Sequence, residues 1–203
     1  MVFSIFILNG EGKLTRNVNL TQNGIKIYTE GNVTFNGQNK NVHFVVSGDN
    51  VLINGITFKN FNYTGNGGAI LWTGANGTLT ECNFNNNTAG SSGGAIYWSG
   101  VNGTLSDCNF INNTAKYGDN VYWNWSVNDF LNKYDQINDF DYVYLKNGEG
   151  TPNRTVVLNK NGVTITTQGN VVFNGQGKNI HFVISGNNTL INGITFKKLQ
   201  LYR

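Results

Sequence analysis

The chain has 203 residues, of which 12% are charged, against about 25% in an average globular protein, and 37 are asparagine. The formal net charge is only +3, and basic residues cluster nowhere except at Lys197, Lys198 and Arg203. This pattern argues against nucleic acid as a partner. No apolar run approaches the roughly 18 residues of a membrane-spanning helix, so we expect no direct membrane insertion.

The chain begins with an apolar segment, Val2 to Leu8, that lacks the basic flank of an export signal and aligns with the later segment Asp141 to Lys146. We therefore interpret it as a strand. Further short apolar segments follow at Val42–Val46, Val51–Ile53 and Ile56–Phe58, separated by Asn, Gly, Asp or Ser. This alternation predicts short strands joined by tight bends.

Next in the chain is a repeat of about 26 residues. GGAILWTGANGTLTECNFNNNTA starts at Gly67, GGAIYWSGVNGTLSDCNFINNTA starts at Gly93, and a third copy opens as GDNVYW at Gly118. A unit of this length holds two or three short strands but no crossover helix, which is typical of one turn of a parallel β-solenoid. The predicted fold is all-β, a right-handed single-stranded parallel β-helix.

The 26-residue step aligns similar residues into columns, which predicts that equivalent side chains stack from coil to coil. An apolar column would be a continuous core, and an asparagine column would chain amide hydrogen bonds. Alternation along the strand places a second set of side chains outside. The predicted columns are Phe35, Phe58, Phe84 and Phe110; Ile53, Leu79 and Leu105; Phe44, Ile70 and Ile96; Asn60, Asn86 and Asn112; and, facing outward, His43, Ala69 and Ala95 with Val45, Leu71, Tyr97 and Tyr122.

A helix interrupts the strands. Ser126 and Asp129 resemble a capping box, and Val127, Phe130, Leu131 and Tyr134 recur at helical spacing, so residues 126–137 are predicted to form a short amphipathic helix and linker. Such a helix would cover the exposed strand edges where the first run of coils ends.

A second, longer period organises the whole chain. The stretch Ile5 to Lys59 returns as Val143 to Lys197, with 34 of 55 positions identical. We therefore predict a β-helix cassette over 1–125 and a truncated second cassette over 138–203, with their relative orientation left open. Because the second copy stops where the first continues into GGAI coils, we expect a fragment of a longer surface protein.

The pairing of Gly-Gly-Ala-Ile (67–70, 93–96) with Phe-x-x-Asn (84–87, 110–113) resembles the repeat signature of the polymorphic outer-membrane adhesins of chlamydiae. The asparagine-rich sequence around it is similar to the large adhesin-like surface proteins of methanogenic archaea. The resemblance implies a right-handed parallel β-helix, export to the cell surface, and attachment to glycans or proteins of another cell. The chain shows no export signal, anchor or autotransporter barrel.

Three functions follow. The first is a non-catalytic, adhesin-like scaffold at the cell surface, the second a polysaccharide lyase or hydrolase of the pectate-lyase-like β-helix type, and the third a structural spacer without a ligand. Nearly every polar feature is repeated, which favours a binding or display surface over a single active site. We therefore assign no catalytic residue, cofactor or metal.

Two groups of residues are candidates for surface function. Tyr97 and Tyr122, with Leu71 in line, would form a platform for sugar rings, or would only cover a neighbouring backbone. The asparagines at 86 and 112 would be either glycosylated or buried in a ladder, since one side chain cannot serve both roles. Asn76, Asn102 and Asn153 are the preferred glycosylation sites among ten Asn-x-Ser/Thr motifs, the others being Asn19, Asn32, Asn62, Asn86, Asn112, Asn124 and Asn187.

The remaining reactive side chains are interpreted as structural. Cys82 and Cys108 fall in the column of Ile56; their spacing permits a disulfide, but parallel Cβ directions favour free thiols. His43 and His181 are long-period copies without nearby ligands. At one bend, Gly55 is replaced in the later coils by a stacked carboxylate pair, Glu81 and Asp107, for which incidental Ca²⁺ binding stays open.

Overall fold

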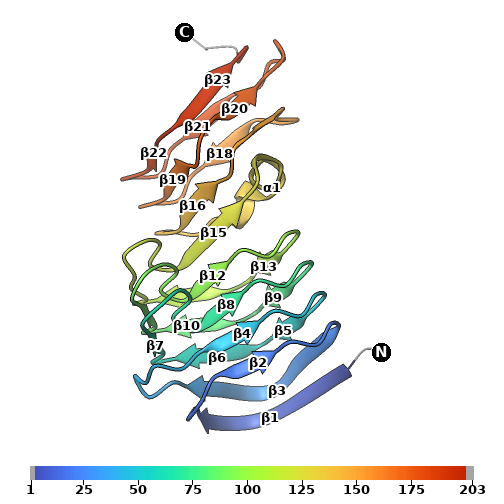
Figure 1. Ribbon diagram of the computed structural model, residues 1–203, viewed down its shortest axis with the longest axis vertical. Helices are drawn as coiled ribbons and strands as arrows, with labels where there is room; N and C mark the ends of the chain where they lie inside the picture. Colours follow the sequence, from blue (N-terminus) through green and yellow to red (C-terminus); the bar gives the residue numbers. More distant parts are fainter. Residues whose placement is uncertain (1–2, 200–203) are drawn as a thin grey trace. The chain divides into compact units, whose positions relative to one another are not determined.

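The computed structural model describes residues 3–199, and the chain divides into two compact units between Tyr122 and Trp123. In each unit, short parallel strands stack as successive rungs (Figure 1). One short α-helix interrupts an otherwise all-β chain. The predicted fold class, a parallel β-solenoid with one interrupting helix, is confirmed.

The first unit contains fourteen strands and the start of a fifteenth, within which the chain passes to the second unit. Their bounds are β1 (Phe3–Lys13), β2 (Val18–Leu20), β3 (Ile25–Asn36), β4 (Phe44–Val46), β5 (Leu52–Asn54), β6 (Ile56–Lys59), β7 (Asn62–Tyr63), β8 (Ile70–Trp72), β9 (Thr78–Thr80), β10 (Asn83–Asn85), β11 (Thr88–Ala89), β12 (Ile96–Trp98), β13 (Thr104–Ser106), β14 (Asn109–Ile111) and β15 (Val121–Trp125).

Three strand columns enclose the core of the first unit. One column runs β2-β4-β8-β12. The long strand β3 bends at Gly31, where φ is +80°, so that its first half pairs with β5 and its second half with β6. Columns β5-β9-β13 and β6-β10-β14 continue from these two halves. The strand predicted at the start of the chain is β1, which pairs with β3.

The predicted apolar columns are present in register. Phe84 pairs with Phe58 on one side and Phe110 on the other, and its ring stacks on theirs at centroid distances of 5.1 and 5.2 Å. Leu79 pairs with Leu105 in the neighbouring column. The phenylalanine side chains at 58 and 84 are fully buried. The 26-residue step therefore places each core side chain on its own equivalent.

The Gly-Gly-Ala-Ile motif has a separate steric reason at each of its positions. Gly67 has φ +72°, a left-handed conformation that favours glycine. Gly68 lies against the backbone of the next coil, where a Cβ would collide with carbonyl oxygens. Ala69 and Ile70 are fully buried. The copy at 93–96 repeats these features, so the motif marks a corner where coils approach too closely for larger residues.

The asparagine ladder lies one position later than predicted. Asn86 and Asn112, assigned to the ladder from the sequence, are exposed and have φ of +56° and +53°. Asparagine tolerates this left-handed conformation better than most residues, so their recurrence reflects a bend and not burial. The buried ladder is formed by Asn87 and Asn113, the last residues of the two Phe-x-x-Asn motifs.

Each buried amide joins two coils. Asn87 Nδ2 donates to the carbonyl of Phe58 (3.1 Å) and to Asn113 Oδ1 (3.0 Å), while Asn87 Oδ1 accepts the backbone N–H of Phe61 (3.1 Å). Asn113 Nδ2 repeats the first bond with the carbonyl of Phe84 (3.0 Å). The amides therefore satisfy backbone groups that the bend leaves without a strand partner.

The second unit is built in the same way around one helix. Its bounds are α1 (Val127–Lys133), the 3₁₀ turn η1 (Tyr134–Gln136), β16 (Tyr142–Leu145), β17 (Gly148–Gly150), β18 (Val156–Leu158), β19 (Thr164–Thr167), β20 (Val171–Asn174), β21 (Phe182–Ile184), β22 (Leu190–Ile191) and β23 (Ile194–Lys197). Its strand columns are β16-β19-β22, β17-β20-β23 and β18-β21.

The predicted capping box opens α1. Asp129 N–H donates to Ser126 Oγ (3.1 Å), and Ser126 N–H donates to Asp129 Oδ2 (3.2 Å). The helix is amphipathic, and its buried Phe130 ring stacks on Phe173 (5.5 Å) and Phe182 (6.3 Å). The helix thus packs into the core of the second unit.

We expect Phe84→Ala to lower the free energy of unfolding by about 3–5 kcal/mol, because it removes a fully buried ring between two others and leaves a cavity. Urea unfolding measures this. Phe6→Ala is the matched control, since Phe6 is 68% exposed, and it should cost less than about 1.5 kcal/mol. Equal losses in the two variants would contradict the stacked core.

Asn87→Ala should destabilise the chain by about 2–4 kcal/mol, because it leaves buried backbone groups without hydrogen bonds. Asn109→Ala, at an exposed strand position, should change stability by no more than about 0.5 kcal/mol. Thermal and urea unfolding compare the two; a ladder without structural weight would give similar values.

Candidate functional site

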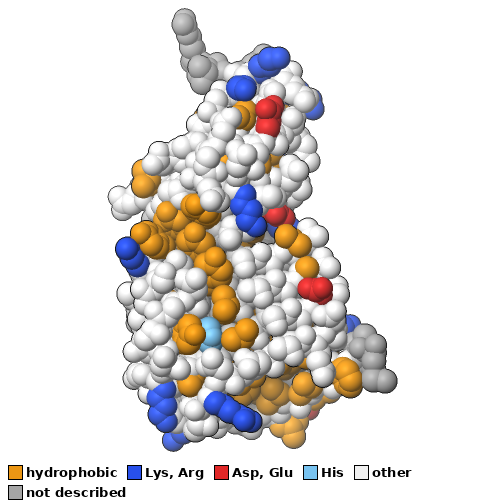
Figure 2. All heavy atoms as spheres, in the orientation of Figure 1, with side chains coloured by type: hydrophobic (Ala, Val, Ile, Leu, Met, Phe, Trp, Pro, Cys, Tyr) orange, Lys and Arg blue, Asp and Glu red, His pale blue; other side chains and the backbone are white. Residues whose placement is uncertain are grey.

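An outward-facing row of apolar side chains runs along column β4-β8-β12 of the first unit. Val45 pairs with Leu71, and Leu71 pairs with Tyr97. With Tyr122, each of these side chains is half-buried, while its strand neighbours point into the core. We call Val45, Leu71, Tyr97 and Tyr122 the aromatic stripe. Figure 2 shows hydrophobic side chains gathered on this face, over β4, β8 and β12.

The two tyrosines of the aromatic stripe stack on each other. The ring centroids of Tyr97 and Tyr122 are 5.0 Å apart, and the ring planes differ by 7°. Because the rings stack in the direction from one strand to the next, they turn their edges outward and not their faces. A ligand would therefore meet ring edges and phenol groups beside the aliphatic surface of Leu71 and Val45.

One predicted outward residue, His43, is buried. Its exposed fraction is 1%, because the ring of Tyr63 in β7 stacks on the imidazole at a centroid distance of 3.6 Å. Ala69 and Ala95, predicted to face outward with it, are also fully buried. The prediction was wrong here because strand alternation says nothing about β7, which is folded over this corner.

The buried imidazole has one assigned hydrogen bond. His43 Nδ1 lies 2.9 Å from the carbonyl oxygen of Gly67, and since a carbonyl only accepts, Nδ1 carries the proton. Burial lowers the pKa of His43, and the bond to Gly67 opposes this shift. His43 is therefore a neutral structural residue beside the aromatic stripe near neutral pH.

The preferred glycosylation motifs lie at the surface. Asn76 and Asn102 are exposed at equivalent corners, with φ of +54° and +55°. Asn153, in the second unit, is exposed as well. All three side chains are open to solvent, as an enzyme that attaches glycans requires.

Both cysteine thiols are free, as predicted. Cys82 Sγ donates to the carbonyl of Thr80, and Cys108 Sγ to that of Ser106, each at 3.2 Å. The hydrogen bond with Cys108, together with burial, raises the pKa of the Cys82 thiol. Cys82 therefore stays protonated and packs as a small apolar residue.

The other candidates show no catalytic arrangement. His181 Nε2 lies 3.0 Å from Asn179 Oδ1. Glu81 and Asp107 are exposed and adopt φ of +56° and +53° at the bend where Gly55 has +78°. Within residues 3–199, no three His, Cys, Asp or Glu side chains are grouped so that they could hold a metal ion.

No protein-family model, curated protein or solved structure matches the chain. In the part of the chain that the structure describes, no helix has the length and apolar character needed to cross a membrane. Only the geometry of the chain therefore bears on its function.

Lowering the pH from about 7.5 to 5 should destabilise the first unit through His43. Because the folded state lowers the pKa of His43 below its ordinary value of about 6.5, the unfolded chain binds the proton first. This contribution is complete above that value and is lost as the pH falls through it. Urea unfolding at several pH values should show a flatter profile for His43→Gln, whereas His181→Gln should retain the wild-type slope.

Proposed function

We propose that the chain is a non-catalytic, adhesin-like β-solenoid of the cell surface that engages glycans or other cells through the aromatic stripe. The observation that carries the proposal is the stripe itself. Four half-exposed apolar side chains follow one another on successive rungs, where a soluble protein has no structural need for them.

The scaffold suits this role because each rung holds its neighbours in place. The strands of the stripe alternate with fully buried residues, among them Trp72 and Trp98, whose rings stack at 4.5 Å. A side chain on such a strand is held in one position, so a ligand pays little for ordering the site. The tyrosines also offer apolar edges and hydroxyl groups together, a combination that suits sugars.

The surface around the stripe is polar but weakly charged, with 37 asparagines and only 12% charged residues in the chain. Amides and hydroxyls recognise neutral glycans by hydrogen bonds and attract few nonspecific ionic partners. The exposed corners at Asn76 and Asn102 would carry N-linked glycans in an exported protein. We therefore place the chain outside the cell.

The test measures binding of the full chain to a glycan array that includes cell-wall polysaccharides and polygalacturonate. The double variant Tyr97→Ala/Tyr122→Ala should bind at least about tenfold more weakly, a change of about 1.4 kcal/mol. Tyr28→Ala is the matched control, because Tyr28 also stacks on an outward ring, Phe6, but in β3. It should bind as the wild type does.

Other outcomes would reject the proposal. Breakdown of a polysaccharide would indicate an enzyme. No binding to any glycan or cell surface would leave a spacer. Equal losses in the Tyr28 variant and the double variant would show that the aromatic stripe is not the contact surface.

A further inference from the structure

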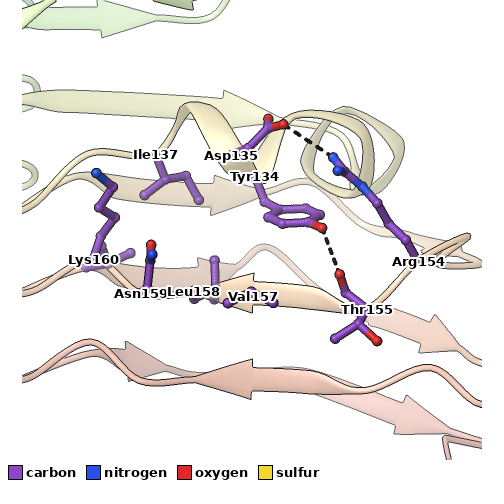
Figure 3. A pocket seen from close by; sticks show the side chains of 10 residues that line it. Tyr134, Asp135, Ile137, Arg154, Thr155, Val157, Leu158, Asn159 and Lys160 are labelled. Atoms are coloured by element: carbon purple, nitrogen blue, oxygen red, sulfur yellow. Dashed lines mark hydrogen bonds and ion pairs between the residues drawn. The ribbon is translucent and has the colours of Figure 1, made fainter.

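The second unit contains a groove between η1 and β18, with a volume of about 540 Å³ (Figure 3). Tyr134 and Ile137 line one side, and Val157 lies on the other. The basic side chains of Arg154 and Lys160 lie toward its opposite ends. All of these residues belong to the second unit.

The groove follows a strand edge that has no strand partner. Among the described strands, β18 pairs only with β21. Val156 N–H donates to the carbonyl of His181, and Leu158 accepts from Ser185 N–H, both at 2.9 Å. Because backbone groups alternate sides along a strand, the N–H and C=O of Val157 between them point to the other edge, toward the groove.

The turn η1 takes the place of a strand at this edge without replacing its hydrogen bonds. Tyr134 Oη donates to the carbonyl of Thr155 at 2.8 Å, just before β18 begins. The side chain of Val157 is 45% exposed. The edge thus combines free backbone groups with an exposed apolar side chain, the two features by which an added strand is recognised.

The charges select the occupant. Arg154 is held by Asp135 (3.3 Å) and lies over the ring of Tyr134, 4.9 Å from its centroid. Lys160 has no carboxylate partner among the described residues. Two basic side chains against one acidic side chain leave the groove with a formal charge of +1. An acidic ligand is therefore favoured over a basic one.

We propose that this groove binds an extended acidic peptide segment of a partner protein, which adds a strand to the free edge of β18. The distance along the strand from Arg154 to Lys160 is about 20 Å at about 3.3 Å per residue, so the segment spans about six residues. One carboxylate meets Lys160, and the backbone of the segment pairs with Val157. A glycan lacks the alternating donors and acceptors that this edge offers.

The groove is distinct from the repeated features of the chain and independent of the aromatic stripe. At the positions equivalent to Val157 and Lys160, the first unit has Asn19 and Gln22. The opposite wall comes from the one helical interruption, through Tyr134 and Ile137. A non-repeated groove suits one specific partner, whereas the stripe suits a repetitive ligand.

Fluorescence anisotropy with the full chain tests the proposal, using a fluorescein-labelled peptide of sequence EVTVE. We expect saturable binding that Lys160→Gln weakens at least fivefold. Lys178→Gln, at an exposed position of the second unit outside the groove, is the matched control and should bind as the wild type does. Binding of the peptide KVTVK at equal strength would overturn the charge argument.

A second pair of measurements tests the strand edge. Val157→Pro removes the free N–H and should abolish binding, whereas Val157→Thr keeps it and should not; circular dichroism checks that both fold. If the proline variant does not fold, an EVTVE peptide methylated at alternate backbone amides gives the same test on the unchanged chain and should not bind. Unimpaired binding in these arms, or no binding of EVTVE to the wild type, rejects the added strand. Stronger binding of oligogalacturonate, unaffected by Val157→Pro, would indicate a sugar site instead.

Discussion

The in-register stacking of coils is the constraint on which the rest of the structure depends. Each residue in the repeat lies on the residue 26 positions earlier, so a ring such as Phe84 packs between copies of itself. A strand spacing near 4.8 Å leaves room for flat rings and small corners but for little else between them. The glycines at 68 and 94 are therefore as necessary as the aromatic core, because any larger residue would separate the rungs.

The same constraint separates two kinds of surface. Where the stacking continues, outward side chains also stack, and the aromatic stripe is the result. Where α1 and η1 interrupt it, β18 has no strand on one edge and a groove is left beside it. A repeated surface presents one chemical feature many times and suits an extended ligand. The interruption presents a single set of residues once, and a specific contact needs a unique site of this kind.

Sequence periodicity predicted much of this molecule from particular residues. The phenylalanine column, the outward position of Tyr97 and the capping box of Ser126 all follow from spacing, because stacking and helix geometry have fixed repeats. The asparagine ladder was placed one residue early, at Asn86, because two adjacent asparagines recur with the same period. Only the backbone conformation separates the left-handed bend at Asn86 from the buried amide of Asn87.

The sequence by itself therefore determined the repeat, the stacking partners along each column and the fold class. The tertiary structure alone decided what lies beside a column. It placed Tyr63 over His43, and it brought Tyr134 to the edge of β18 opposite Val157. The physical reason is that contacts along the stack join residues at a constant separation, which a repeat reveals. Lateral contacts depend on how a loop or helix folds back, and no fixed spacing in the chain records them.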